Sequence, residues 1–136
     1  MVGLLLITHN RTGNELLSTA RTMLGNLPMP CYALAIDRDD DPEQIICGAH
    51  ATIAELDQGD GLLILTDIYG STPSNIANRL AVDIEARVVS GVNLPMVIRV
   101  LNYSDLNLQM LTEKAVSGGQ DGVIRCKKMQ EPDQDA

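Results

Sequence analysis

Aromatic residues are almost absent from this 136-residue chain, which has no Trp, no Phe and only three Tyr. Its apolar content of 45% therefore comes mainly from Leu, Ile, Val, Ala and Met. An aliphatic core is feasible, because a chain of this length buries about two-thirds of its unfolded surface. Nucleic-acid bases stack on aromatic rings, so the sequence offers little for base recognition.

Basic residues are also scarce. Ten Lys and Arg face 18 Asp and Glu, for a formal net charge of −8, and the only adjacent basic pair is Lys127-Lys128. Such a chain is repelled by phosphate backbones and anionic lipid surfaces, so we predict no nucleic-acid partner and no direct membrane insertion. A protein with a basic face suits it, since complementary charge steers encounter, although the same net charge also keeps a protein soluble.

Cysteines and long apolar runs are few. Cys31, Cys47 and Cys126 are odd in number and widely spaced, with no Cys-x-x-Cys, which indicates neither a disulfide framework nor a metal site. We expect them to be small buried hydrophobes in a reducing compartment. No stretch reaches the ~20 apolar residues of a membrane span, and the N-terminal apolar run is too short for a signal peptide. These features predict a cytoplasmic protein.

Short apolar runs alternate with amphipathic stretches along the chain. Strands are predicted at residues 2–7, 31–36, 62–66 and 86–90, and helices begin near Thr12, Pro42, Pro73 and Ser104. Elements that alternate in this way predict an α/β fold with a doubly wound, mainly parallel sheet and helices on both faces. We expect one domain over residues 1–128.

The C-terminal region is predicted to add an edge to this sheet. A turn at residues 118–122 leads into a short, mixed strand at 123–126, and such a strand is typical of an edge. Edges need cover, which pairing with a second subunit would supply. Residues 129–136 are acidic with nothing to bury, so a disordered tail is expected.

Two chemically useful side chains stand where predicted strands end. His9 stands in the turn between the first strand and the first helix, and Asp67 follows the third strand. The carboxyl ends of parallel strands open into one crevice, which is where open α/β sheets keep their sites. A carboxylate that accepts a hydrogen bond from one ring nitrogen can orient an imidazole nucleophile and stabilise the positive charge that it develops. We predict His9 as a phosphoryl-accepting nucleophile and Asp67 as the residue that orients it.

The loops around these residues resemble anion sites. Both combine hydroxyl, amide and glycine residues with a following helix N-terminus, where backbone N–H groups favour a bound anion. We predict that Thr72 hydrogen-bonds the phosphoryl group and that the phosphate-binding loop includes Thr8, Asn10, Gly70 and Ser71. Turn or helix-capping roles are the alternative for Asp67, Ser71 and Thr72. His50 falls mid-helix, where a structural role is expected.

Together these residues resemble the IIA components of the mannose family of the bacterial phosphoenolpyruvate-dependent sugar phosphotransferase system. The resemblance spans residues 2 to about 124. It is carried by Thr8-His9, by Thr66-Asp67-x-x-Gly70-x-Thr72-Pro73-x-Asn75 and by the stretch 90–96. The family commonly has glycine or serine where this chain has Asn10, and a second glycine where it has Ser71.

The resemblance implies a phosphotransferase. His9 would accept a phosphoryl group from the phosphohistidine of the carrier protein HPr and pass it to a separate IIB protein, in sugar uptake or in regulation. Asp67 would hydrogen-bond the histidine, and Thr72 would place its hydroxyl near the phosphate. The family also implies a homodimer that exchanges a C-terminal strand, and a reaction without metal or organic cofactor.

Other functions fit parts of the same pattern. A non-catalytic regulatory module of the same fold is compatible with Asn10 and Ser71. A flavodoxin-like flavin binder is suggested by the polar loop at 8–15, but only Tyr69 is placed to stack on a flavin. A response-regulator receiver needs two acidic residues after the first strand, where this chain has Thr8-His9-Asn10.

Overall fold

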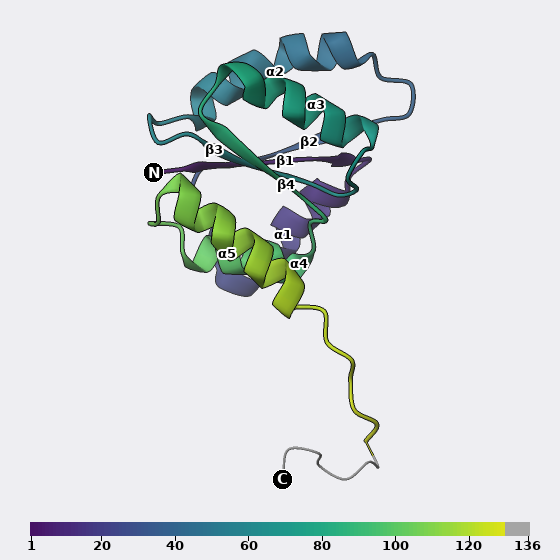
Figure 1. Cartoon of the computed structure of the whole chain (residues 1–136), viewed down its shortest axis with the longest axis vertical. Coiled ribbons are helices and arrows are strands. Elements are labelled where there is room, and N and C mark those ends of the chain that lie inside the picture. Colours follow the sequence, from purple (N-terminus) through teal and green to yellow (C-terminus); the bar gives the residue numbers. More distant parts are fainter. Residues whose placement is uncertain (130–136) are drawn as a thin grey trace.

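The computed structural model describes residues 1–129 and shows a parallel sheet between two layers of helices (Figure 1). The four strands lie in the order β2-β1-β3-β4 and comprise β1 (Gly3–His9), β2 (Cys31–Ile36), β3 (Leu62–Thr66) and β4 (Ala86–Ser90). One face carries α1 (Thr12–Leu24), α4 (Leu94–Asn102) and α5 (Leu108–Asp121), and the other carries α2 (Pro42–Leu56) and α3 (Thr72–Leu80), with a 3-10 turn at Ala81–Asp83. The predicted doubly wound α/β fold is confirmed.

The central strands β1 and β3 supply the heart of the core. Leu4, Leu5, Leu6 and Ile7 of β1 are each at most 1% exposed. Successive side chains of a strand point to opposite faces, so Leu4 and Leu6 join the apolar cluster under α1, α4 and α5, and Leu5 and Ile7 join the one under α2 and α3. Unbroken apolar runs in the sequence therefore correspond to strands covered on both faces.

The first helices begin and end at residues whose local chemistry favours those ends. At α2, the Asp41 side chain accepts a hydrogen bond from the Glu43 N–H at 3.0 Å, and Pro42 is the first helical residue. At the end of α1, Gly25 adopts a left-handed conformation with φ 85°. Both helices match their predicted positions.

Helix α5 differs from the prediction. It begins after Asn107, which accepts a hydrogen bond from the Met110 N–H at 2.9 Å, and it continues through the glycines that predicted a turn at 118–122. A Cβ added at Gly118 would lie 2.7 Å from the Cβ of Arg99 on α4. These glycines are needed for the close approach of α5 to α4, and the predicted turn was wrong for this tertiary reason.

The predicted strand at 123–126 is absent from the described chain. This segment leaves the end of α5 and runs away from the body of the protein (Figure 1), with Val123 78% and Ile124 73% exposed. A strand exists only where another strand hydrogen-bonds to it, and within residues 1–129 none lies beside this segment. Strand exchange in a dimer stays a prediction. Of the predicted acidic tail, residues 130–136 lie outside the described residues.

The cysteines are more exposed than expected. Cys47 and Cys126 are exposed, so the prediction of buried side chains was wrong for both. Cys31 is partly buried, and burial raises the pKa of its thiol to about 12. Within residues 1–129, no helix combines the length and the apolar character needed to cross a membrane.

Candidate functional site

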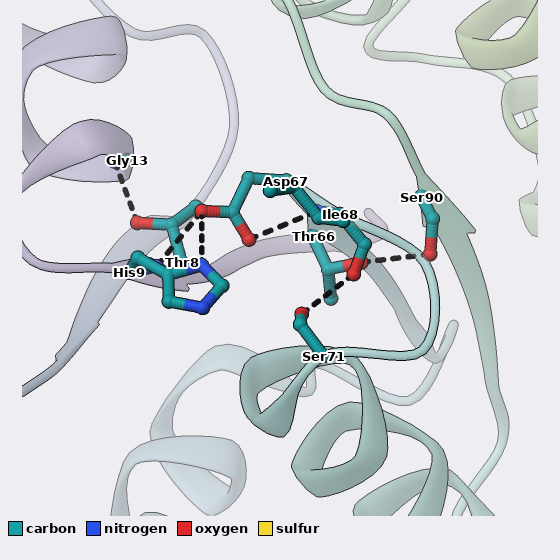
Figure 2. Close-up of polar contacts among 8 residues, drawn as sticks. All are labelled: Thr8, His9, Gly13, Thr66, Asp67, Ile68, Ser71 and Ser90. Carbon is teal, nitrogen blue, oxygen red and sulfur yellow. Dashed lines mark hydrogen bonds and ion pairs between the residues drawn. The ribbon is translucent and has the colours of Figure 1, made fainter. Parts of the chain in front are cut away.

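His9 and Asp67 meet at the carboxyl edge of the sheet. Strands β1 and β3 are parallel neighbours with Ile7 opposite Thr66, so the residues that follow emerge side by side. One carboxylate oxygen of Asp67, Oδ2, accepts hydrogen bonds from both the backbone N–H and the ring Nδ1 of His9, each at 2.9 Å (Figure 2). The ring is thus held by the same oxygen that fixes its backbone.

This contact determines the tautomer of the His9 ring. An ionised carboxylate can only accept hydrogen bonds, so Nδ1 carries the proton and Nε2 keeps its lone pair in the neutral ring. Figure 2 shows the second ring nitrogen pointing away from Asp67. The His9 side chain is 45% exposed, whereas that of Asp67 is 14% exposed. In the neutral ring, the nitrogen that points away from Asp67 is therefore the one without a proton, and it can act as a nucleophile.

Asp67 is kept ionised by its hydrogen bonds. Partial burial pushes its pKa upward, but the His9 backbone N–H, the His9 ring and the Ile68 N–H outweigh that effect and hold the pKa below its usual range. The Ile68 N–H donates to Oδ1 at 3.0 Å, so both carboxylate oxygens are used. A fixed negative charge at Nδ1 favours positive charge on the ring, which is what bond formation at Nε2 produces.

Thr8 lies below this site. Its side chain is fully buried, and its hydroxyl oxygen accepts a hydrogen bond from the Gly13 N–H at 2.8 Å. The predicted contact of Thr8 with phosphate does not fit this position, because the hydroxyl faces the first turn of α1. Thr8 instead ties the end of β1 to the start of α1.

Asn10 carries the backbone strain of the site. Its φ of 49° is the only positive value at a non-glycine residue among residues 1–129. Asparagine enters this left-handed region more readily than most residues that carry a side chain. The Asn10 N–H donates to the Ile36 carbonyl at 2.9 Å, which links the loop to the end of β2.

The loop between β3 and α3 is held mostly by its own contacts. Gly70 has φ 82°, and the Ser71 hydroxyl donates to the Ile68 carbonyl at 2.6 Å (Figure 2). Ser71 therefore does not cap α3 with its side chain. Thr72 is the first residue of that helix, where backbone N–H groups suit an anion.

Residues at or just after the ends of β1, β2 and β3 line one cavity of about 430 Å³. It is lined by His9 and Asn10, by Thr72 and Pro73, and by residues of the segment 36–42 that include Asp37, Arg38 and Asp40. The structure thus brings His9, Asn10 and Thr72 to one cavity, while Gly70 and Ser71 belong to the neighbouring loop. Sequence reasoning missed the segment 36–42, although it follows a parallel strand and the same strand-end rule applies to it.

Fold and site together define a class: a doubly wound α/β protein with a carboxylate-held histidine at the carboxyl edge of its sheet. Residues 3–116 match the family model described as the PTS system fructose IIA component, named EIIA-man, and the chain belongs to this family. The resemblance to mannose-family IIA components is thereby confirmed.

Relatives and solved structures agree with this assignment. The mannose-specific EIIAB component of Escherichia coli K12 is 32% identical over 129 residues, which cover 93% of this chain and 40% of the relative. The putative phosphotransferase enzyme IIA component YadI of the same strain is 29% identical and covers 74% of this chain and 69% of its own. The mannose/sorbose-specific IIA subunit of Enterococcus faecalis has the same fold, with a TM-score of 0.85, 24% identity and coverage of 96% and 98%.

Proposed function

We propose that the protein is a phosphocarrier whose His9 accepts a phosphoryl group from phospho-HPr and passes it to a separate IIB protein. The observation that carries the proposal is the His9–Asp67 hydrogen bond, which leaves the proton-free Nε2 of the neutral ring on a 45% exposed side chain beside a cavity. Membership of the IIA family supports it. The setting is sugar uptake or its regulation, in the cytoplasm.

The reaction exchanges one nitrogen–phosphorus bond for another. The lone pair of Nε2 attacks the phosphorus atom of the donor phosphohistidine, and the donor nitrogen leaves with the electron pair of the bond that breaks. Because the bond that forms and the bond that breaks are both nitrogen–phosphorus bonds, the step is reversible. Its rate depends on positioning and electrostatics, without a metal or organic cofactor. Asp67 stabilises the imidazolium that forms.

Thr72 and the first N–H groups of α3 would hold the transferred phosphoryl oxygens. Thr72 lines the cavity that His9 also lines. Helix N-termini stabilise anions through the helix dipole and their unpaired N–H groups. Asn10, at the same cavity, would shape its entrance, and Gly70 and Ser71 would set the position of the adjoining loop.

Protein partners would dock around this cavity. Next to Asp67, Ile68 is 62% and Tyr69 is 84% exposed. Exposed apolar and aromatic side chains beside a reacting group are typical anchors of protein–protein interfaces. A second copy of the chain would pair with the exposed segment 123–126, which gives the homodimer with exchanged strands.

The direct test is the intact mass of the protein after incubation with phosphoenolpyruvate, enzyme I and HPr. We expect a gain of one acid-labile phosphoryl group, which is lost in His9→Ala. His50, the other histidine of the chain, is exposed on α2, so His50→Ala is a matched control that should still gain the group. No gain in the unmodified protein with an active donor system would refute the proposal and favour a non-catalytic regulatory module.

A further inference from the structure

The cavity beside His9 contains one basic side chain. Of the residues that line it, only Arg38 is a lysine or arginine, and His9 and Thr72 line the same space. Arg38 comes from the loop between β2 and α2, which reaches the carboxyl edge of the sheet next to the loop that bears His9. The proposed function did not use this loop.

The loop that carries Arg38 has a well-fixed backbone. The Asp37 N–H donates to the Asp40 carboxylate at 2.7 Å, and the Asp40 N–H donates to the Asp37 carbonyl at 3.1 Å. Asp41 caps α2, and the Ile36 carbonyl accepts from the Asn10 N–H. Two of the acidic side chains that follow Arg38 are therefore engaged by backbone N–H groups.

The guanidinium of Arg38 has no such engagement. It is exposed and makes no hydrogen bond or ion pair with any of residues 1–129. In contrast, Arg79 pairs with Glu43, Arg87 with Glu85 and Arg99 with Asp121. The loop therefore holds the base of the Arg38 side chain in place and leaves its charged end available to a ligand.

Charge balance shows which ligand this would be. A phosphoryl group brings about −1.5 to −2 charges at neutral pH. A phosphoryl group on His9 would share the cavity with the carboxylates of Asp37 and Asp40. The Asp67 carboxylate is also near, because it is hydrogen-bonded to Nδ1 on the other side of the His9 ring. Without Arg38, the side chains that line the cavity would supply no permanent positive charge to offset that repulsion.

We propose that the Arg38 guanidinium binds the phosphoryl group carried by His9. Its planar array of N–H donors matches two phosphoryl oxygens, which gives a stronger and more directed contact than a lysine provides. Arg38 thereby favours the phosphorylated form of His9 over the free form. This inference rests on the proposed phosphocarrier function and assigns a residue to it.

The test compares Arg38→Gln with the unmodified protein in rapid-quench transfer from phospho-HPr. We expect the rate of His9 labelling to fall about tenfold, as for loss of one charge-assisted hydrogen-bonded contact. At equilibrium, more phosphoryl should remain on HPr. Phosphorus-31 NMR titration should show a raised pKa for the phosphoryl group, because a neighbouring cation favours its more charged form. Arg38→Lys should restore part of each effect.

Arg21→Gln is the matched control, since it removes the same charge from a groove between α1 and β2 that His9 does not line. An equal loss in Arg21→Gln would overturn the inference, because net charge alone would then explain the effect. So would an Arg38→Gln protein with unchanged rate and unchanged phosphoryl pKa. In both of these outcomes His9 of the unmodified protein is still phosphorylated. Failure of the unmodified protein to become phosphorylated would instead overturn the phosphocarrier function itself.

Discussion

Asp67→Asn changes the site in a way that the structure makes calculable. The carboxylate accepts three N–H groups, two from His9 on Oδ2 and one from Ile68 on Oδ1. A carboxamide has only one oxygen, so its NH2 group must face either the Ile68 N–H or the two His9 nitrogens. In the first case a donor–donor contact replaces a hydrogen bond. In the second, Nδ1 must give up its proton, and the proton moves to Nε2, the attacking atom.

The expected loss of transfer rate has two sources, the lost hydrogen bonds and the missing negative charge. Hydrogen bonds to a charged group contribute about 1.5–3 kcal/mol each, and the carboxylate charge that stabilises the imidazolium disappears as well. A loss of about 3 kcal/mol in the transition state corresponds to roughly a hundredfold slower transfer. The variant should still fold, because the carboxamide has nearly the same shape as the carboxylate, although it loses the stability that the hydrogen-bonded carboxylate contributes.

Rapid-quench transfer from radiolabelled phospho-HPr measures this rate under single-turnover conditions. Asp105→Asn is a suitable control, since Asp105 is exposed near the N-terminus at the other end of the sheet. A transfer rate in Asp67→Asn within a factor of two or so of the unmodified protein would refute the assigned role of the carboxylate. A loss that follows thermal unfolding of the variant would refute it too.

Three further predictions concern stability and assembly. Because the pKa of Asp67 is lowered in the folded protein, its contribution to stability is complete above the unfolded pKa of about 3.9 and is lost as pH falls through the still lower folded value. The difference in unfolding free energy between the protein and Asp67→Asn should therefore shrink below about pH 4, and a difference that grew on acidification would contradict this prediction. Gly118→Ala should destabilise the protein by about 1–3 kcal/mol in urea unfolding, because the new Cβ would lie 2.7 Å from the Cβ of Arg99. Gly48→Ala in α2, where a new Cβ has no neighbour within 4 Å, should stabilise it by up to about 1 kcal/mol, and equal effects of the two variants would refute the packing role of Gly118. Val123→Asp combined with Ile124→Asp should convert a dimer to monomers in light scattering without loss of helix content, and a persistent dimer would exclude the segment 123–126 from the interface.

The segment 123–126 and helix α5 show where sequence reasoning failed. An apolar run after a glycine cluster is typical of a turn followed by a strand, yet Gly118 and Gly119 lie inside α5. Glycine is needed at these two positions because Arg99 and Met96 of α4 pack against them, and a local sequence pattern does not include those residues. Likewise, Val123 and Ile124 can form a strand only when an edge of another strand lies beside them.

Thr8 and Arg38 show the same limit at the site. The sequence placed Thr8 in the phosphate loop because it adjoins His9, but strand alternation and the start of α1 direct its hydroxyl to Gly13. Arg38, nearly thirty positions from His9 in the sequence, shares its cavity because β2 and β1 are parallel neighbours. Adjacency along the chain and adjacency in the fold are different quantities.

Apolar periodicity and helix-end residues within short windows predicted the alternation of strands and helices and the positions of His9 and Asp67 at strand ends. Three features of the site arise when the sheet is assembled: one oxygen of Asp67 holds both the backbone and the ring of His9, the second ring nitrogen points away from Asp67, and Arg38 lines the same cavity. Those features depend on the direction of side chains from separate strands, which is fixed by the packing of the whole sheet.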